Sequence, residues 1–249
     1  MYILKKTLLL KQNKKCFDFR GHEIMNELMI DKFVKYCEDN FNLNEKRYAE
    51  FYNSLSVCII DCIYSLRARY FKVVVPIVER YAKKYMDNNR FNSDDTLENL
   101  IYNIDSSGGP EIFAKEVLHN NQYSGGVLKA TICYEMARLL LMLGINTKED
   151  FANYKSTEIL EIVIRSIKGV GDAATNYLFM LAGDPNRCKP DVHLHNCVND
   201  ACGYYISNDE CQELMRDAVI KLNGKYPNLT VSLLDSIIWR VYQEKRINK

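Results

Sequence analysis

The sequence predicts an all-α protein. Only five prolines and eleven glycines occur in 249 residues, which favours long helices over a turn-rich β architecture. Apolar residues recur at intervals of three and four along most of the chain, and no segment strongly alternates apolar and polar residues. No repeat with a period of about 20–50 residues is present, which argues against a solenoid. We therefore expect roughly nine helices or more.

Helical spacing of apolar residues predicts the helices of the first half of the chain. They are expected over 23–40, over 52–66, over 73–85 and from Leu97 onward. Pro76 falls in the first turn of the third helix, where proline is tolerated. Ser93 and Asp94 are candidate N-caps for the fourth.

Breaks and caps divide the second half. Residues 106–110 (SSGGP) interrupt the helical pattern, and residues 119–126 (HNNQYSGG) are predicted to be a polar loop. Gly144 is the expected C′ residue of a helix that begins at Lys129. Helices are expected over 111–118, 129–143 and 146–150, from 156 or 157 to 168, from 191 to about 201, over 207–223 and from 232 onward.

Composition and charge place the chain among ordinary globular proteins. Its net charge is +1, so any nucleic-acid binding must rely on local basic patches rather than on bulk charge. No apolar run approaches the roughly 18–20 residues that span a bilayer, and the N-terminus is a poor signal peptide. The nine cysteines are an odd number, and Cys58, Cys62 and Cys133 lie inside apolar helical patterns. We expect a cytoplasmic protein with reduced cysteines and no membrane segment.

One stretch carries most of the functional information. A helical pattern ends at Lys168–Gly171, which reads KGVG, and another begins at once with Asp172. We call Lys168–Gly171 the glycine corner. Glycine lacks the side chain that would keep a phosphate from the backbone N–H groups. About twenty residues later, Pro190 precedes Asp191 at a predicted helix start. Each feature alone has an ordinary structural explanation, as a tight turn and as a helix cap, but their combination favours a functional one.

These residues together resemble the helix-hairpin-helix/GPD superfamily of DNA base-excision glycosylases. The superfamily includes endonuclease III, the adenine-mismatch glycosylase and the alkylpurine glycosylases, and the motifs here are nearest to the alkylpurine branch. The similarity is best from Glu158 to Val198 and weaker over 56–81, 125–145 and 233–239. It implies a two-lobed helical fold with a DNA-facing cleft between the lobes. The implied lobes are 55–183, which ends in the helix-hairpin-helix (156–183), and 1–54 plus 184–249, which carries Asp191.

The resemblance also implies roles for individual residues. The corner would bind DNA phosphate, in the family often with a monovalent cation, through Lys168, Gly169, Val170, Gly171 and Ala173. The target base would be flipped out beside Asp191, the catalytic residue. One ionised aspartate can stabilise the oxocarbenium-like sugar and activate water, which suffices for hydrolysis of the N-glycosidic bond. The candidates for the base pocket are Asn120, Asn121, Gln122, Tyr123, Tyr64 and Trp239.

Two departures from the family pattern bear on the chemistry. Bifunctional members have a lysine two residues after the hairpin as the amine nucleophile, whereas this chain has Ala173 there, and Lys189 does not match that position. We therefore expect a monofunctional enzyme without β-lyase activity. Iron–sulfur relatives use four closely spaced cysteines. The nearest candidates here are Cys188, Cys197, Cys202 and Cys211, separated by eight, four and eight residues. We expect these cysteines to form neither an iron–sulfur cluster nor, together with His193 and His195, a zinc site. We expect no other cofactor.

Several alternatives stay open at this stage. Two basic groups can face DNA or simply solvent: Arg67, Arg69 and Lys72, and Arg165, Lys168, Arg187 and Lys189. His193 and His195 can assist Asp191 or be ordinary helix residues. The chain, expected to be a monomer that binds DNA, can be a repair glycosylase or an inactive helix-hairpin-helix DNA-binding protein. It can also be a glycosylase that removes modified bases from foreign (phage) DNA in antiviral defence, or an interaction protein without a DNA role.

Overall fold

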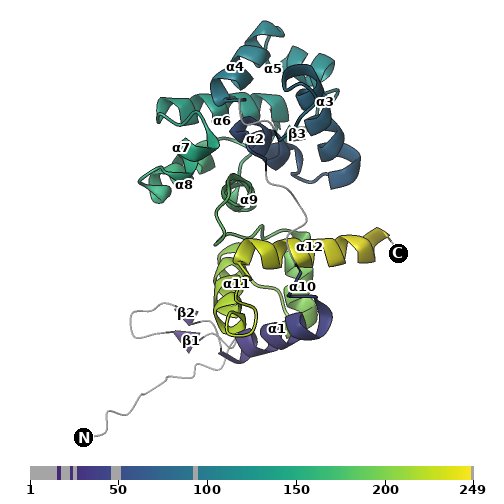
Figure 1. The fold of residues 1–249 in the computed structure, drawn as a ribbon, viewed down its shortest axis with the longest axis vertical. Helices are drawn as coiled ribbons and strands as arrows, with labels where there is room; N and C mark the ends of the chain where they lie inside the picture. The colour runs from purple at the N-terminus through teal and green to yellow at the C-terminus, as the bar shows by residue number, and fades with distance from the viewer. Residues whose placement is uncertain (1–15, 18–22, 25–26, 46–51, 92–94, 248–249) are drawn as a thin grey trace, which may run out of the picture. The chain divides into compact units, whose positions relative to one another are not determined.

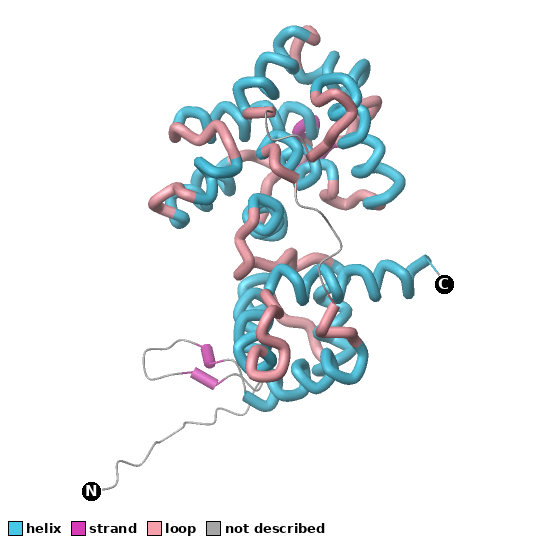
Figure 2. The backbone as a smooth tube through the Cα atoms, in the orientation of Figure 1, coloured by secondary structure: helices cyan, strands magenta, loops and turns pink. Residues whose placement is uncertain are grey.

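The computed structural model describes residues 16–17, 23–24, 27–45, 52–91 and 95–247. Within these ranges the chain forms twelve α-helices, two single π-helical turns and two antiparallel pairs of two-residue strands (Figures 1 and 2). The all-α prediction is therefore confirmed for the described part of the chain. The strand pairs are β1 (Cys16–Phe17) with β2 (Glu23–Ile24), and β3 (Tyr123–Ser124) with β4 (Val127–Leu128).

The chain divides into two compact units. The central unit comprises residues 47–189, and the terminal unit comprises residues 1–46 and 190–249. The resemblance placed these boundaries at 54/55 and 183/184, a few residues away. The glycine corner lies in the central unit, whereas Asp191 belongs to the terminal unit.

The central unit is built around one helix, α2 (Leu55–Tyr64), which is buried along its whole length. Its N-cap is Ser54, whose side chain accepts a hydrogen bond from Val57 N. Around α2 pack α3 (Val75–Tyr85), α4 (Leu97–Ser106), α6 (Lys129–Met142) and α9 (Asp172–Ala182). A helix without a polar face needs neighbours on every side, and these four supply them.

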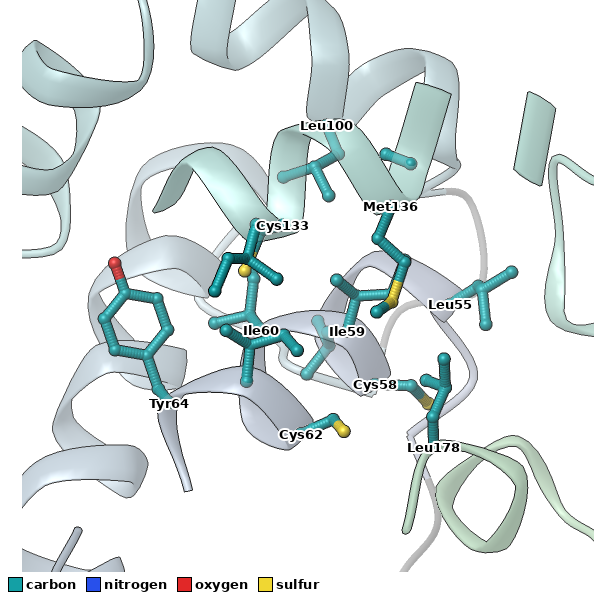
Figure 3. Packing of buried hydrophobic residues seen from close by; sticks show 14 of the residues in the cluster. Leu55, Cys58, Ile59, Ile60, Cys62, Tyr64, Leu100, Cys133, Met136 and Leu178 are labelled. Carbon is teal, nitrogen blue, oxygen red and sulfur yellow. The ribbon is translucent and has the colours of Figure 1, made fainter. Parts of the chain in front are cut away.

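Aliphatic side chains, thiols and aromatic rings fill the core of this unit, and Figure 3 shows part of it, including Tyr64. Cys58 and Cys62 of α2 and Cys133 of α6 are free and buried, as their apolar surroundings in the sequence predicted. Burial raises the pKa of the Cys58 thiol to about 12, so this side chain is a neutral thiol at physiological pH. These cysteines act as small hydrophobic residues.

The structure differs from the sequence prediction at several connections. The caps predicted at Ser93 and Asp94 lie outside the described residues, and Thr96 caps α4. The segment expected to begin the third helix starts as a π-helical turn, η1 (Tyr70–Val74). The segment expected over 111–118 is split into α5 (Pro110–Ile112) and a second π-helical turn, η2 (Phe113–Val117).

The predicted polar loop at 119–126 was partly wrong. Its end forms the β3–β4 hairpin, with Gly125 and Gly126 as the two turn residues. Their φ values of +57° and +80° lie in the left-handed region that two-residue hairpin turns require. The remaining helices of the unit are α7 (Lys148–Ala152) and α8 (Thr157–Ser166). Of the two predicted caps of α8, Ser156 and Thr157, the structure has Ser156.

The terminal unit is a small helical bundle. It consists of α1 (Glu27–Asn40), α10 (Val192–Cys202), α11 (Asn208–Leu222) and α12 (Val231–Ile247). Helix α1 packs on α10 and α11, and α12 covers both of these helices. Its core includes Phe33, Cys37, Cys197, Met215 and Leu234. The first residue before α10 is Asp191, so this bundle fixes the position of the predicted catalytic side chain within its own unit.

Candidate functional site

The glycine corner joins α8 to α9 as predicted. Val170 is buried and its N–H group donates to Ile167 O at 3.1 Å, which closes the turn. Lys168 is exposed and makes no ion pair within the described part of the chain. Helix α9 then begins at Asp172 without an interruption. The corner therefore presents a lysine and the start of a helix to solvent.

Gly169 is required by the fold itself. Its φ is +94°, and a Cβ at this position would lie 2.5 Å from Ser124 O and 2.8 Å from Ile132 Cδ1. The Ser124 hydroxyl group also donates to Gly169 O at 2.8 Å. Gly125 of the β3–β4 hairpin approaches from the other side, since its own Cβ would lie 2.8 Å from Gly169 Cα. The first glycine of the corner thus packs against a hairpin, independently of any ligand.

Gly171 has no such structural requirement. Its φ is −119°, a value open to any residue, and a Cβ here would meet nothing within 4 Å. It is the N-cap of α9, and no side chain caps the free N–H groups of the first turn. A small residue at an exposed, uncapped helix start leaves those N–H groups accessible to an anion.

The basic residues around the corner differ in how far they are neutralised. Arg165 Nε lies 3.2 Å from Asp172 Oδ1, and Arg165 also pairs with Glu161. Arg187 forms ion pairs with Glu161 and with Asp184, and it donates to Asn176 Oδ1 at 2.8 Å. The predicted group of four cations is therefore partly offset by acids.

Lys189 is held inside the central unit. Its ammonium group lies 3.8 Å from the centroid of the Tyr177 ring and donates to Ser65 Oγ at 3.0 Å. By contrast, the other predicted basic group is exposed: Arg67, Arg69 and Lys72 lie on the connection from α2 to α3. Arg67 has a φ of +53°, an uncommon conformation for a residue other than glycine.

Two carbonyl oxygens of the glycine corner, and that of Ile167 just before it, accept hydrogen bonds from the protein. Ile167 O accepts from Val170 N, Gly169 O from Ser124 Oγ, and Gly171 O from Thr175 N. Each of these carbonyl oxygens keeps a second lone pair, so the monovalent cation that the resemblance implies at the corner stays a prediction. No cation enters the mechanism proposed below.

Asp191 is the N-cap of α10. Its Oδ1 accepts hydrogen bonds from His193 N at 2.8 Å and Leu194 N at 3.3 Å. Within the described part of the chain Oδ2 accepts none, and the side chain is partly exposed to solvent. One carboxylate oxygen therefore stabilises the helix while the other stays available for chemistry.

The two histidines after Asp191 have structural roles. His193 is buried and lies edge-on to the Trp239 ring, with 6.3 Å between the ring centroids. His195 Nε2 lies 3.0 Å from Asn208 Oδ1, and its Nδ1 lies 3.6 Å from Cys211 Sγ. Burial raises the pKa of the Cys211 thiol to about 12, so this cysteine–histidine–asparagine contact contains a neutral thiol rather than a nucleophile.

The base-pocket candidates lie in different parts of the structure. Asn121 and Tyr123 are exposed, Tyr123 by 65 %, on the segment that leads into the β3–β4 hairpin. Through Ser124 this segment contacts Gly169, so the structure brings these two candidates next to the glycine corner. Asn120 Oδ1 accepts from Gln122 N at 3.0 Å and shapes the same turn.

Tyr64, another predicted base contact, is a core residue. Its side chain is fully buried, and its hydroxyl group is the one buried side-chain polar atom of the described residues without a hydrogen-bond partner. A ring enclosed by the core cannot stack on a base. Trp239 is partly exposed but belongs to the terminal unit, where it packs against His193.

Two residues stand out among the buried ionisable side chains that the sequence analysis did not identify. Lys129, 2 % exposed, donates from Nζ to Leu66 O at 2.7 Å, Gln122 Oε1 at 3.0 Å and Tyr64 O at 3.2 Å. Burial lowers its pKa to about 8.

The second is Asp61, which is fully buried in α2 and accepts hydrogen bonds from Tyr52, Tyr70 and Tyr177. The available signal was a single acid inside the apolar run VCIIDCIY. A lone carboxylate in such a run must find donors in the core.

A family model described as a domain of unknown function (DUF8548) matches residues 31–243. The chain belongs to the DUF8548 family. The match spans both units and includes the glycine corner and Asp191. No curated protein matches the chain significantly.

Two further properties concern the described residues of this DUF8548 protein. They contain no group of three or more histidine, cysteine, aspartate or glutamate side chains arranged to hold a metal ion. The four cysteines considered for a cluster (Cys188, Cys197, Cys202 and Cys211) are free. None of the described helices is both long enough and apolar enough to cross a bilayer.

Proposed function

We propose that this DUF8548 protein is a monofunctional DNA glycosylase with the helix-hairpin-helix fold. It would flip a damaged or modified base out of the helix and hydrolyse its N-glycosidic bond. The motif similarity supports this activity, because both the glycine corner and the Pro190-Asp191 pair are present. Ala173 supports the absence of a lyase step, since alanine has no amine to attack the sugar.

The observation that carries the proposal is the state of the Asp191 carboxylate. Capping occupies Oδ1, whereas Oδ2 makes no hydrogen bond within the described part of the chain and the side chain reaches solvent. The two N–H groups that donate to Oδ1 fix the orientation of the carboxylate at the start of α10. An ionised aspartate with a free oxygen is the group that this hydrolysis needs.

In the proposed reaction the bond between C1′ and the base nitrogen breaks, and its electron pair leaves with the base. The sugar develops positive charge, which the Asp191 carboxylate stabilises electrostatically. Water then adds to C1′, and Asp191 accepts its proton. Asp191 returns this proton to solvent, and the departing base nitrogen takes up one proton from solvent. The products are the free base and an abasic site, with the DNA strand intact.

DNA binding would rest on the glycine corner. A phosphate at the start of α9 would accept hydrogen bonds from the uncapped N–H groups near Gly171 and Ala173, and Lys168 would add an unpaired positive charge. The exposed Asn121 and Tyr123, next to this corner, are suited to contact the flipped base or its neighbours by hydrogen bonding and stacking.

The test is base release from a panel of oligonucleotides. Duplex and single-stranded DNA carrying alkylated, mismatched or hypermodified bases is incubated with the full-length protein, and abasic sites are revealed by alkali. Strand scission is expected only after alkali treatment. Scission without alkali would contradict the monofunctional assignment.

Asp191→Asn is the decisive variant. Asparagine also caps helices, so α10 should keep its N-cap while the negative charge is lost. Base release should fall at least about a thousandfold, with DNA affinity little changed. Asp209→Asn is the matched control, since Asp209 is an exposed acid in the first turn of α11 in the same unit. Retained turnover in Asp191→Asn would refute the catalytic assignment.

A second candidate function is that of a catalytically inactive DNA-binding protein. The capping role of Asp191 favours it, because this role alone would explain the residue. DNA binding by the wild-type protein without release of any base on the panel would support this function. Release restricted to the hypermodified bases of phage DNA would instead support a role in antiviral defence.

A further inference from the structure

A cavity of about 500 Å³ lies along one face of α3 in the central unit. Pro76, Glu79, Arg80 and Lys83 line it from the helix at intervals of three and four residues, and the turn 88–91 closes it from the other side. The volume falls within the range of sites for small molecules. No residue of the glycine corner and no base-pocket candidate lines this cavity.

The cavity carries an excess of positive charge. Its lining contains Arg80, Lys83 and Arg90 against one acid, Glu79. Arg90 Nη1 lies 3.9 Å from Glu79 Oε1, too far for a hydrogen bond. Arg80 donates from Nε to Leu118 O at 2.8 Å, which fixes its guanidinium group. The terminal nitrogens of Arg80 have no hydrogen-bond acceptor among the described residues. The Arg90 guanidinium group lies over the Phe91 ring, with 5.0 Å from Cζ to the ring centroid, and its only acid within ion-pair distance among the described residues is Glu79.

The turn that closes the cavity is held in an uncommon conformation. Asp87 and Asn88 have φ values of +49° and +61°, two consecutive left-handed residues that are not glycine. Asn88 N donates to Ala82 O at 3.0 Å, and Asn89 Oδ1 accepts from Phe91 N at 3.0 Å. The Phe91 ring stacks on Tyr52, with 5.9 Å between their centroids. Aspartate and asparagine adopt this conformation more readily than other non-glycine residues, and these contacts fix the shape of the turn.

The dipole of helix α3 does not account for all of the basic residues around the cavity. Basic residues in the last turn of a helix complement its dipole, which accounts for Lys83 and Lys84. Arg80 lies earlier in α3, and Arg90 lies beyond its end. Two guanidinium groups and one ammonium group around a single cavity match a dianionic phosphate, which offers three acceptor oxygens.

We propose that this cavity binds the phosphomonoester of a nucleotide. The phosphate would lie among Arg80, Arg90 and Lys83, and Pro76 and the amide of Asn88 would contact the nucleoside. A free mononucleotide and the 5′-phosphorylated end of a DNA strand share this chemistry. The proposal does not involve Asp191, so it stands or falls independently of the glycosylase assignment.

Calorimetric titration of the full-length protein tests the site. The probes are dAMP, dCMP, dGMP, dTMP, deoxyadenosine and inorganic phosphate, followed by single-stranded oligonucleotides with either a 5′ phosphate or a 5′ hydroxyl group. At least one nucleotide should bind about tenfold or more tightly than both deoxyadenosine and inorganic phosphate. Preference for the phosphorylated oligonucleotide over the free nucleotides would assign the strand end, and the reverse would assign the free nucleotide.

Single substitutions locate the binding. Arg90→Gln and Lys83→Gln should each weaken nucleotide binding about tenfold. Lys84→Gln, which removes a neighbouring charge outside the cavity lining, is the matched control and should leave it unchanged. Asp191→Asn should bind nucleotides like the wild type. Circular dichroism verifies that each variant is folded.

Three results would overturn the proposal. The first is the absence of binding by all probes at millimolar concentration. The second is equal affinity for deoxyadenosine and dAMP, which would remove the role of the phosphate. The third is an equal loss of affinity in Lys84→Gln and Arg90→Gln, which would indicate general electrostatic attraction rather than a site.

Discussion

The hydroxyl group of Tyr177 donates a 2.9 Å hydrogen bond to Oδ1 of Asp61, a side chain without solvent exposure. Tyr52 and Tyr70 donate to Oδ2 of the same carboxylate at 2.9 and 2.7 Å. These tyrosines come from α9, from the segment before α2, and from η1. One buried acid on α2 thus connects the helix that begins at the glycine corner to the basic connection between α2 and α3.

Asp61→Asn should destabilise the protein. The variant disrupts hydrogen bonds in a place that water cannot reach, because the single oxygen of an amide group cannot accept from all three hydroxyl groups. We expect the free energy of unfolding to fall by about 2–4 kcal/mol. Urea denaturation followed by circular dichroism measures it. Tyr52→Phe removes a single donor, so it should lower the free energy of unfolding by less than Asp61→Asn does. The opposite order would contradict the stabilising role of Asp61.

The same substitution should change the pH dependence of stability. Burial raises the pKa of Asp61 above its ordinary value of 3.8, and the three hydroxyl donors and Lys189 offset only part of this shift. The folded state therefore binds a proton more readily than the unfolded state. The stabilisation that results is present below pH 3.8 and is lost as the pH rises through the folded-state pKa. The stability of the wild type relative to Asp61→Asn should consequently decrease from acidic to neutral pH.

Substitution of each glycine of the corner by alanine should have a different effect on stability and on DNA binding. Gly169→Ala places a Cβ 2.5 Å from Ser124 O in a left-handed residue, so we expect a loss of stability of about 2–4 kcal/mol. Gly171→Ala meets no atom and should change stability by less than about 1 kcal/mol. If a phosphate approaches the start of α9, Gly171→Ala should nevertheless weaken DNA binding. Thermal unfolding and fluorescence anisotropy with labelled DNA separate the two effects.

Much of the fold follows from local sequence. The helix from Lys129 was expected to end at Gly144, and the structure gives α6 over Lys129–Met142 with Gly144 at a φ of +77°. The N-cap of α8 was expected at Ser156 or Thr157, and it is Ser156. The β3–β4 hairpin was missed because its strands have only two residues each, too few for an alternating pattern. Its turn residue Gly125 packs against Gly169, which is far away in the sequence.

The candidate site was less predictable because side-chain partners are set by tertiary packing. Sequence placed Asp191 at a helix start, and it is the cap of α10. Sequence could not show that Tyr64 points into the core or that acids neutralise Arg165 and Arg187. The donors to Asp61 lie on three separate segments, so no local pattern reveals them.

Lys129 should make stability depend on pH in the alkaline range. Burial lowers its folded-state pKa to about 8, below the ordinary value of 10.5, so the unfolded state binds the proton more strongly. Its contribution to stability is greatest above pH 10.5 and is lost as the pH falls through 8. Lys129→Met removes this titration. The difference in unfolding free energy between the wild type and Lys129→Met should thus shift in favour of the wild type as the pH rises from 8 toward 10.5.

The salt dependence of DNA binding should distinguish Lys168 from Arg165. Each protein cation that neutralises a duplex phosphate contributes about 0.9 to the slope of log affinity against log salt concentration. Lys168 makes no ion pair within the described part of the chain, whereas Arg165 is already paired with Glu161 and Asp172. Lys168→Ala should therefore reduce the slope by about 0.9. Arg165→Ala, the matched control on the same corner, should change it much less, because the two acids compete with phosphate for its charge. Equal slopes in the wild type and Lys168→Ala would show that this lysine does not contact DNA, and the phosphate site would then have to lie elsewhere than the glycine corner.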